Sequence, residues 1–244
     1  MMAYILVGIL GACIGSFLNV VIYRVPKNLS IINPRSHCPK CHKAIPIYHN
    51  IPLLTWLFLR GKSACCKTPI SIQYPFVEFM SMVLFLLVFA KEGLAWNALI
   101  VSMVFVLLLV LSVMDYYHQV IFDSVSLTTL ALSFFVGSFI DSVHAILVLI
   151  GSLMLIRFYT SFFFGKETLG EGDIIIAGIM GGVLGIKEAL FSLFVAALIA
   201  LPFSYFTKDK KKRVPFVPFL SISTLLVYYF DWAVNWYFKF IHLA

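Results

Sequence analysis

Long uncharged apolar runs limit what this chain can fold into more than any other feature. Of its 244 residues, 61% are hydrophobic and only 12% are charged, about half the charged share of an ordinary soluble domain. A helix that crosses a bilayer needs about 20 mostly apolar residues. We therefore predict an all-α polytopic membrane protein with about eight transmembrane helices, at residues 3–23, 74–90, 95–114, 124–140, 143–163, 174–186, 188–206 and 216–238.

The basic residues predict how these helices are oriented. Residues 24–73 hold eight Lys and Arg and no Asp or Glu, and a second basic cluster, KDKKKR, occupies residues 208–213. Because Lys and Arg concentrate in cytoplasmic loops, both regions are predicted to be cytoplasmic. The predicted parts are a first transmembrane helix (1–23), a small cytoplasmic cysteine-containing loop domain (24–73) and a larger transmembrane domain (74–244). The net charge of +7 then reflects topology and attraction to anionic lipid, and we expect no nucleic-acid partner.

Two aspartates lie at the ends of predicted helices. Asp115 ends the third span in VLSVMDYYHQ, and Asp173 begins the sixth in GEGDIIIAG. The chain crosses the bilayer twice between them, so both carboxylates are predicted at the cytoplasmic face. Two neighbouring carboxyl groups can share one proton, so that one activates a water molecule while the other protonates the substrate.

This pattern favours an aspartic protease, but two alternatives remain open. In a proton-coupled membrane transporter, Asp115 and Asp173 would be relay residues, because acids inside membranes often carry protons. Such carriers often show inverted repeats, which this sequence lacks. The third interpretation is a membrane scaffold without catalysis, for which two acids at equal depth have no use.

Glycines surround the second aspartate. Gly170 and Gly172 carry no side chain that would block a substrate strand from pairing with the backbone beside Asp173. The small residues farther along favour a different role, because they let helices approach closely; these are Gly178, Gly181 and Gly182.

Four further charged residues need an interpretation. Glu78 lies inside the second span, where an acid is a functional candidate unless it reaches water at the interface. Asp123 is predicted to cap the helix that follows it. Glu171 is predicted to face solvent, and the Arg157 side chain to extend toward the membrane surface.

Four of the five cysteines cluster in the loop of residues 24–73. Cys38 and Cys41 form a CxxC pair, and Cys65 and Cys66 follow about 24 residues later. This spacing resembles a zinc site, in which the metal replaces a missing hydrophobic core, whereas stable disulfides are not expected in the cytoplasm. The second pair is irregular, so the predicted ligands are three thiolates completed by Cys65, His37 or His42.

Five blocks occur in the order seen in prepilin peptidases, which this chain resembles over nearly its whole length. They are GACIGSFLNVVIYRVP (11–26), CPKC (38–41) followed by IPIYHNIPLLTWLFLRGK (45–62), TPISIQYPFVE (68–78), MDYYHQVIFD (114–123) and GEGD (170–173). The resemblance implies a GxGD membrane aspartic protease of the bacterial inner membrane with Asp115 and Asp173 as catalytic residues, so that 74–244 is the peptidase domain.

The resemblance also implies substrates and a cofactor. The family removes the basic leader of type IV prepilins and pseudopilins on the cytoplasmic side, in pilus and type II secretion systems. Many members then methylate the new N-terminus with S-adenosylmethionine, although the sequence shows no glycine-rich nucleotide loop. The chain departs from the family pattern at Ser63, where a second CxxC would begin, at Phe122 in place of Pro and at Val217 in place of Gly.

Overall fold

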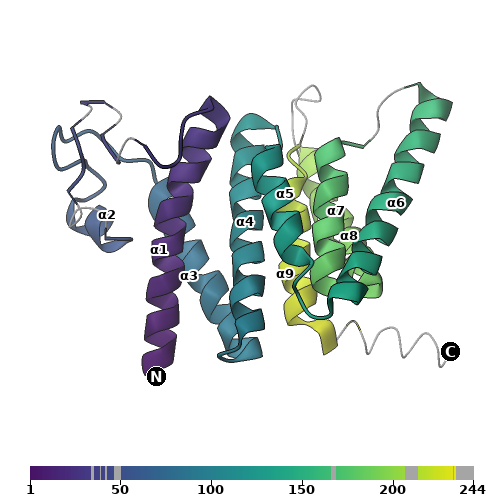
Figure 1. The fold of residues 1–244 in the computed structure, drawn as a ribbon. Coiled ribbons are helices and arrows are strands. Elements are labelled where there is room, and N and C mark those ends of the chain that lie inside the picture. Colours follow the sequence, from purple (N-terminus) through teal and green to yellow (C-terminus); the bar gives the residue numbers. More distant parts are fainter. Residues whose placement is uncertain are drawn as a thin grey trace. The chain divides into compact units, whose positions relative to one another are not determined.

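A computed structural model describes residues 1–33, 36–38, 40–41, 43–46, 51–165, 169–206, 214–232 and 234. Within these ranges all regular elements are helices, which confirms the predicted all-α class (Figure 1). In chain order they are α1 (Met2–Arg24), the 3-10 helix η1 (Val25–Lys27), α2 (Leu54–Phe58), α3 (Gln73–Glu92), α4 (Trp96–His118), α5 (Asp123–Ser133), α6 (Phe139–Phe164), α7 (Glu171–Leu184), α8 (Ile186–Phe206) and α9 (Val217–Tyr229).

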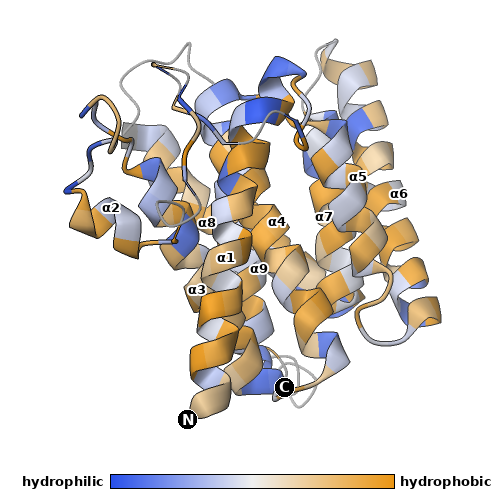
Figure 2. Ribbon diagram, turned by 60° about the vertical axis from the view of Figure 1, so that its left-hand side comes forward, coloured by the Kyte–Doolittle hydropathy of each residue, from blue (hydrophilic) through white to orange (hydrophobic). Residues whose placement is uncertain are grey.

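Five helices among the described residues are long and apolar enough to cross a membrane: α1, α3, α4, α6 and α8. Figure 2 shows mostly hydrophobic residues along the helices and hydrophilic residues in many of the connecting segments. The other predicted spans correspond to α5, α7 and α9, with 11, 14 and 13 residues. At 1.5 Å per residue, 14 residues extend about 21 Å, less than the hydrocarbon thickness of about 30 Å. The five long apolar helices make this a multi-pass membrane protein. Because the other three helices are short, the count of eight spans stays a prediction.

The chain forms two compact units, Met1–Ala98 and Leu99–Ala244. In the first unit α1 packs along α3, with the two helices side by side (Figure 1). Gly11 and Gly15 permit this approach, because a Cβ at Gly11 would lie 2.9 Å from the Ser81 carbonyl oxygen and one at Gly15 would lie 2.8 Å from the Ser81 hydroxyl. Small residues therefore bring the two backbones close, as is common between membrane helices.

Glu78 of α3 is hydrogen-bonded to the segment that contains the four loop cysteines. Its side chain is buried, and Oε2 accepts a hydrogen bond of 2.7 Å from the backbone amide of Leu53. Leu53 has φ 60° and immediately precedes α2, so the carboxyl group fixes an unusual backbone conformation at the start of that helix. Glu78 thus binds backbone rather than reaching out to water.

The second unit is arranged around α7, which packs against α5, α6, α8 and α9. The predicted packing role of its glycines is confirmed. A Cβ at Gly181 would lie 3.0 Å from the Ala145 carbonyl oxygen of α6, and one at Gly182 would lie 2.7 Å from the Ser133 hydroxyl of α5; Gly178 likewise faces Ile150 of α6.

Some predicted boundaries differ from the helices observed. The fourth span was expected over 124–140, but α5 ends at Ser133 and α6 begins at Phe139. Gly137, with φ 77°, lies in the connection, and this left-handed conformation interrupts a helix. The basic cluster 208–213 and residues 235–238 of the last predicted span lie outside the described residues.

Candidate functional site

Asp115 lies in the last turn of α4, held against the start of α9. Its side chain is 8% exposed, and Oδ2 accepts a hydrogen bond of 3.1 Å from the backbone amide of Val217. One turn earlier, the Ser112 hydroxyl donates to the Ser221 hydroxyl of α9 at 2.8 Å. The two contacts fix the direction of the Asp115 carboxyl group through residues about 100 positions away in sequence.

Asp173 is the third residue of α7 and is half-buried. The backbone amide of Gly170, at the cap position of the helix, hydrogen-bonds the Asp173 carboxylate. An acid at this position commonly reaches back to the cap residue and satisfies an amide that has no partner within the helix. A Cβ at Gly170 would lie 3.1 Å from Asp173 Oδ2, so a larger residue would crowd the carboxyl group.

The two aspartates line one cavity of about 610 Å³ in the second unit. The charge of Asp115 acts directly on the Asp173 carboxyl group. The walls come from the ends of three helices and the segments next to them, and include Gln119, Ile121, Asp123, Leu169, Gly170, Gly172, Ile175, Val214, Pro215 and Phe216. Two carboxyl groups that share a cavity and interact electrostatically have the arrangement needed to divide acid and base roles.

Gly172 lies against Ile121 of the α4–α5 connection. A Cβ at Gly172 would come closest to Cδ1 of Ile121 and would also lie 2.8 Å from its Cβ and Cγ1, closer than real carbon atoms pack. The structure therefore supplies a steric reason for this glycine beside its predicted role as open backbone. Ile121 was not singled out in the sequence, because a single apolar residue in a short connection carries no periodic signal.

The other charged residues have mostly local roles. Asp123 is the first residue of α5, and Phe122 rather than Asp123 occupies the cap position; the predicted cap is one residue off, although an acid in the first turn still favours the helix dipole. Glu171 has an 80% exposed side chain, as predicted, and pairs with Arg157 Nη2 of α6 at 3.0 Å. Arg157 of α6 thus binds the first residue of α7.

The four loop cysteines come together in the first unit. The sulfur atoms of Cys38, Cys41, Cys65 and Cys66 all lie within 4.8 Å of one another. Cys41 and Cys65 are separated by 3.1 Å and Cys38 and Cys66 by 3.5 Å. A tetrahedral zinc site with Zn–S bonds of about 2.3 Å places its sulfurs about 3.8 Å apart, so this donor set fits zinc. His42 lies outside the described residues, and His37 pairs with Ala44 in a β-bridge.

Two similar turns explain the irregular second cysteine pair. The amide of Cys38 donates to the Lys43 carbonyl at 3.0 Å, and the amide of Ser63 donates to the Thr68 carbonyl at 2.8 Å. Both bonds join a residue to the fifth residue after it, so Ser63 occupies in the second turn the position of Cys38 in the first. Cys66 then corresponds to Cys41, and Cys65 supplies the sulfur that Ser63 lacks.

Three of these thiols have shifted pKa values, and the shifts differ in direction. Backbone amides of Cys41 and Lys40 lower the pKa of Cys38, and the Ser63 and Thr68 hydroxyls lower the pKa of Cys66 to about 5. The neighbouring sulfur of Cys65 raises the pKa of Cys41 to about 12. Four sulfurs this close repel one another as thiolates, and a bound cation removes that conflict.

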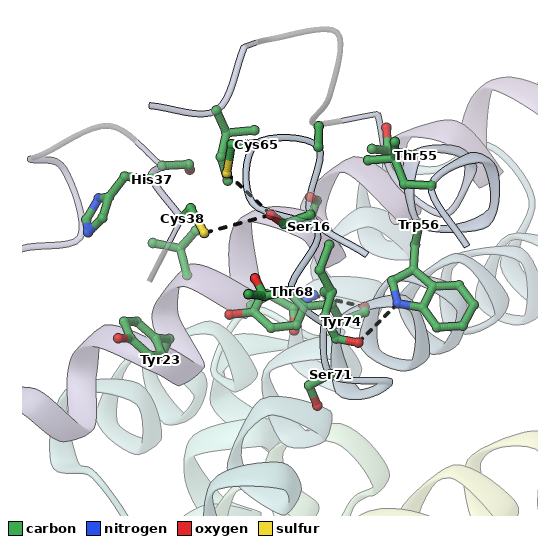
Figure 3. Close-up of a pocket in the computed structure, with 18 of the residues that line it drawn as sticks. Ser16, Tyr23, His37, Cys38, Thr55, Trp56, Cys65, Thr68, Ser71 and Tyr74 are labelled. Atoms are coloured by element: carbon green, nitrogen blue, oxygen red, sulfur yellow. Dashed lines mark hydrogen bonds between the residues drawn. The ribbon is translucent and has the colours of Figure 1, made fainter. Parts of the chain in front are cut away.

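A second cavity, of about 440 Å³, lies beneath the cysteines in the first unit. It is bounded by the end of α1, α2 and the start of α3, and Cys38 and Cys65 line it together with aromatic side chains (Figure 3). Asn19 of α1 also lines it. No sequence pattern predicted this cavity, because its walls come from segments that are far apart along the chain.

Each of the two units contains a region that matches a known protein family. Residues 9–92 match the family model of the bacterial peptidase A24 N-terminal domain, and residues 102–205 match that of the type IV leader peptidase family. No solved structure matches the chain.

Relatives similar to this chain align over most of its length. A prepilin leader peptidase/N-methyltransferase of Neisseria gonorrhoeae is 33% identical over 95% of this chain and 93% of its own. An enzyme of the same name from Pectobacterium carotovorum subsp. carotovorum is 34% identical over 88% and 89%. A type 4 prepilin-like proteins leader peptide-processing enzyme of Escherichia coli is 32% identical over 90% and 91%. With nearly full-length relatives above 30% identity and both family models matched, this chain belongs to the type IV leader peptidase family.

Proposed function

We propose that this protein is an aspartic endopeptidase of the bacterial inner membrane that removes the basic leader from type IV prepilins and pseudopilins and then methylates the new N-terminus. The observation that carries the proposal is the shared cavity of Asp115 and Asp173, in a chain whose relatives are named for this reaction. A transporter has no comparable support, because the family to which the chain belongs is one of peptidases.

The cleavage follows from two carboxyl groups that share a proton. The ionised member takes a proton from water as the water oxygen attacks the scissile carbonyl carbon, and the protonated member donates to the carbonyl oxygen. When the C–N bond breaks, a proton passes from the dyad to the leaving amine. The Val217 amide orients Asp115 and the Gly170 amide orients Asp173, so neither carboxyl group has to be repositioned during the reaction.

The reaction is proposed to occur at the cytoplasmic membrane boundary. Support comes from the eight basic and no acidic residues in 24–73 and from the basic cluster 208–213, which directly precedes the cavity residues Val214 and Pro215. The pilin segment after the leader is apolar and lies in the bilayer, so its scissile bond reaches a carboxyl pair at this depth. Because leader and loop are both basic, anionic lipid would neutralise the repulsion.

Zinc and S-adenosylmethionine are the proposed cofactors. Cys38, Cys41, Cys65 and Cys66 would hold zinc, which supplies a structural crosslink in a segment too small for its own core. S-adenosylmethionine supplies an electrophilic methyl group on a sulfonium sulfur. The neutral amine of the new N-terminus would accept that methyl group.

The direct test mixes membranes that contain the protein with a type IV prepilin and follows leader loss on a gel. Asp115→Asn and Asp173→Asn are each expected to abolish cleavage, because an amide can neither accept the proton from water nor donate one. Glu171→Gln is the matched control and is expected to cleave normally, since Glu171 lines the cavity but its carboxylate is 80% exposed and pairs with Arg157. Normal cleavage by either Asp variant would exclude the dyad. Labelled S-adenosylmethionine in the same assay measures methylation separately.

A further inference from the structure

The cavity beneath the cysteine cluster has the size and shape of a ligand site. Its volume of about 440 Å³ lies within the usual range of small-molecule pockets, about 300–1,000 Å³. All of its walls belong to the first unit, which matches the family's N-terminal domain. None of its lining residues also lines the cavity that contains the two aspartates.

One wall carries a hydrogen-bond acceptor that has no partner. Asn19 is 2% exposed, and its Nδ2 donates to the Tyr74 carbonyl at 3.0 Å. Its Oδ1 has no hydrogen-bond partner among the described residues. A buried polar atom without a partner costs about 1–3 kcal/mol, so a ligand that donates an N–H to Asn19 would remove that cost.

The lining also includes one acidic and one basic side chain. Glu78 contributes a buried carboxyl group from α3, and Arg24 contributes a buried guanidinium group from the end of α1. The Arg24 guanidinium also donates to the Ser30 carbonyl at 2.8 Å, which holds it at the wall. A ligand with both a cationic and an anionic end matches these groups, as an amino-acid moiety does.

The apolar part of the cavity is aromatic. Tyr23, Trp56 and Tyr74 line it, with the Trp56 ring held by a hydrogen bond of 3.4 Å from its indole nitrogen to the Ile70 carbonyl (Figure 3). Aromatic rings stack on heterocyclic bases and attract cations over their faces. A ligand with a planar base and a positively charged centre satisfies both preferences.

We propose that this cavity binds S-adenosylmethionine, with Asn19 accepting from one of its N–H groups and Trp56 contacting its aromatic base or its sulfonium. The cofactor combines a purine base with an amine, a sulfonium cation and an amino-acid group, and so presents each of the groups that the walls select. This proposal rests on the methyltransferase part of the proposed function, to which it assigns a site.

The experiment measures binding of S-adenosylhomocysteine, the product that cannot react further, to the purified full-length protein in lipid nanodiscs by isothermal titration calorimetry. The wild-type protein is expected to bind one molecule per chain. Asn19→Leu, close in shape but without the amide, is expected to weaken binding about tenfold. Trp56→Ala is expected to weaken it about five- to tenfold.

Ser81→Ala is the matched control, because among the described residues the Ser81 hydroxyl is the other buried side-chain polar atom without a hydrogen-bond partner, and it does not line the cavity. Its affinity should stay within about twofold of wild type. Circular dichroism and gel filtration check that each variant is folded, and if Asn19→Leu does not fold, Trp56→Ala decides. Wild-type affinity in both cavity variants would overturn the proposal, as would absence of binding by a preparation that still removes prepilin leaders. A wild-type preparation that removes no leader would instead overturn the proposed function.

Discussion

The steric contact between Gly172 and Ile121 gives a prediction whose magnitude follows from the structure. In Gly172→Ala the new methyl group would lie 2.8 Å from Cβ and Cγ1 of Ile121, about 1 Å inside ordinary carbon contact. Overpacking of this kind costs about 1–3 kcal/mol. Taking the middle of that range, about 2 kcal/mol, and subtracting up to about 1 kcal/mol for the better helix propensity of alanine leaves a net cost of about 1–2 kcal/mol.

The overpacked contact joins the first turn of α7, which carries Asp173, to the α4–α5 connection, which follows Asp115. If relief of the strain displaces the carboxyl groups, leader cleavage falls about 5- to 30-fold at 1–2 kcal/mol. The assay is initial-rate leader removal from a prepilin in nanodiscs. Gly170→Ala serves as comparison, because its new methyl group would be 3.1 Å from Asp173 Oδ2 and would touch no residue of the connection.

A second substitution separates the steric explanation from the open-backbone hypothesis. Ile121→Gly removes the atoms that the new methyl group would meet, so Gly172→Ala in that background should cost much less than in the wild-type chain. A double-mutant cycle on the two sites is then expected to show a coupling energy of about 1 kcal/mol or more. Unchanged cleavage in Gly172→Ala, or an equal loss in both backgrounds, would refute the steric explanation; an equal loss would favour a role in substrate pairing.

Two further predictions concern the cysteine cluster and the packing of α7. Elemental analysis is expected to find one zinc ion in the wild-type chain and none in Cys65→Ser. Adding Ser63→Cys to that variant should restore the zinc, because Ser63 occupies the position of the missing thiol; failure of the restoration would contradict the assignment of the two turns. Gly182→Ala should lower the unfolding temperature in detergent, since its methyl group would lie 2.7 Å from the Ser133 hydroxyl and such overpacking costs about 1–3 kcal/mol. Gly151→Ala, with open space at its Cβ, should not lower it, and equal melting of the two variants would show that the α5–α7 contact is not tight.

The apolar runs alone predicted most of the fold. Each of the eight predicted spans corresponds to a helix. The prediction succeeds because hydropathy and helix formation depend on residues that are close together in the sequence. The lengths of three of these helices could not be predicted. The end of α5, for example, depends on Gly137 taking a left-handed conformation, which glycine permits but does not require.

The sequence likewise predicted only part of the candidate site. The positions of Asp115 and Asp173 at helix ends, the CxxC pair and the basic loop are visible in sequence, because each depends on residue type and spacing within a short stretch. Which residues complete each site was not visible. The Val217 amide that holds Asp115 and the Ile121 side chain beside Gly172 are neighbours only after the helices pack.

The sequence by itself determined that this chain is helical, lies in a membrane and carries two acids at helix ends. Only the tertiary structure decided that Cys65 replaces the sulfur absent at Ser63. It also decided that a cavity lies beneath the cysteines, lined by Asn19, whose Oδ1 has no partner in the part of the chain that the structure describes. The physical reason is the range of the interactions. Hydropathy and helix propensity act over one or two turns, whereas ligand geometry, hydrogen-bond satisfaction and cavity shape depend on atoms that the fold brings together from distant parts of the chain.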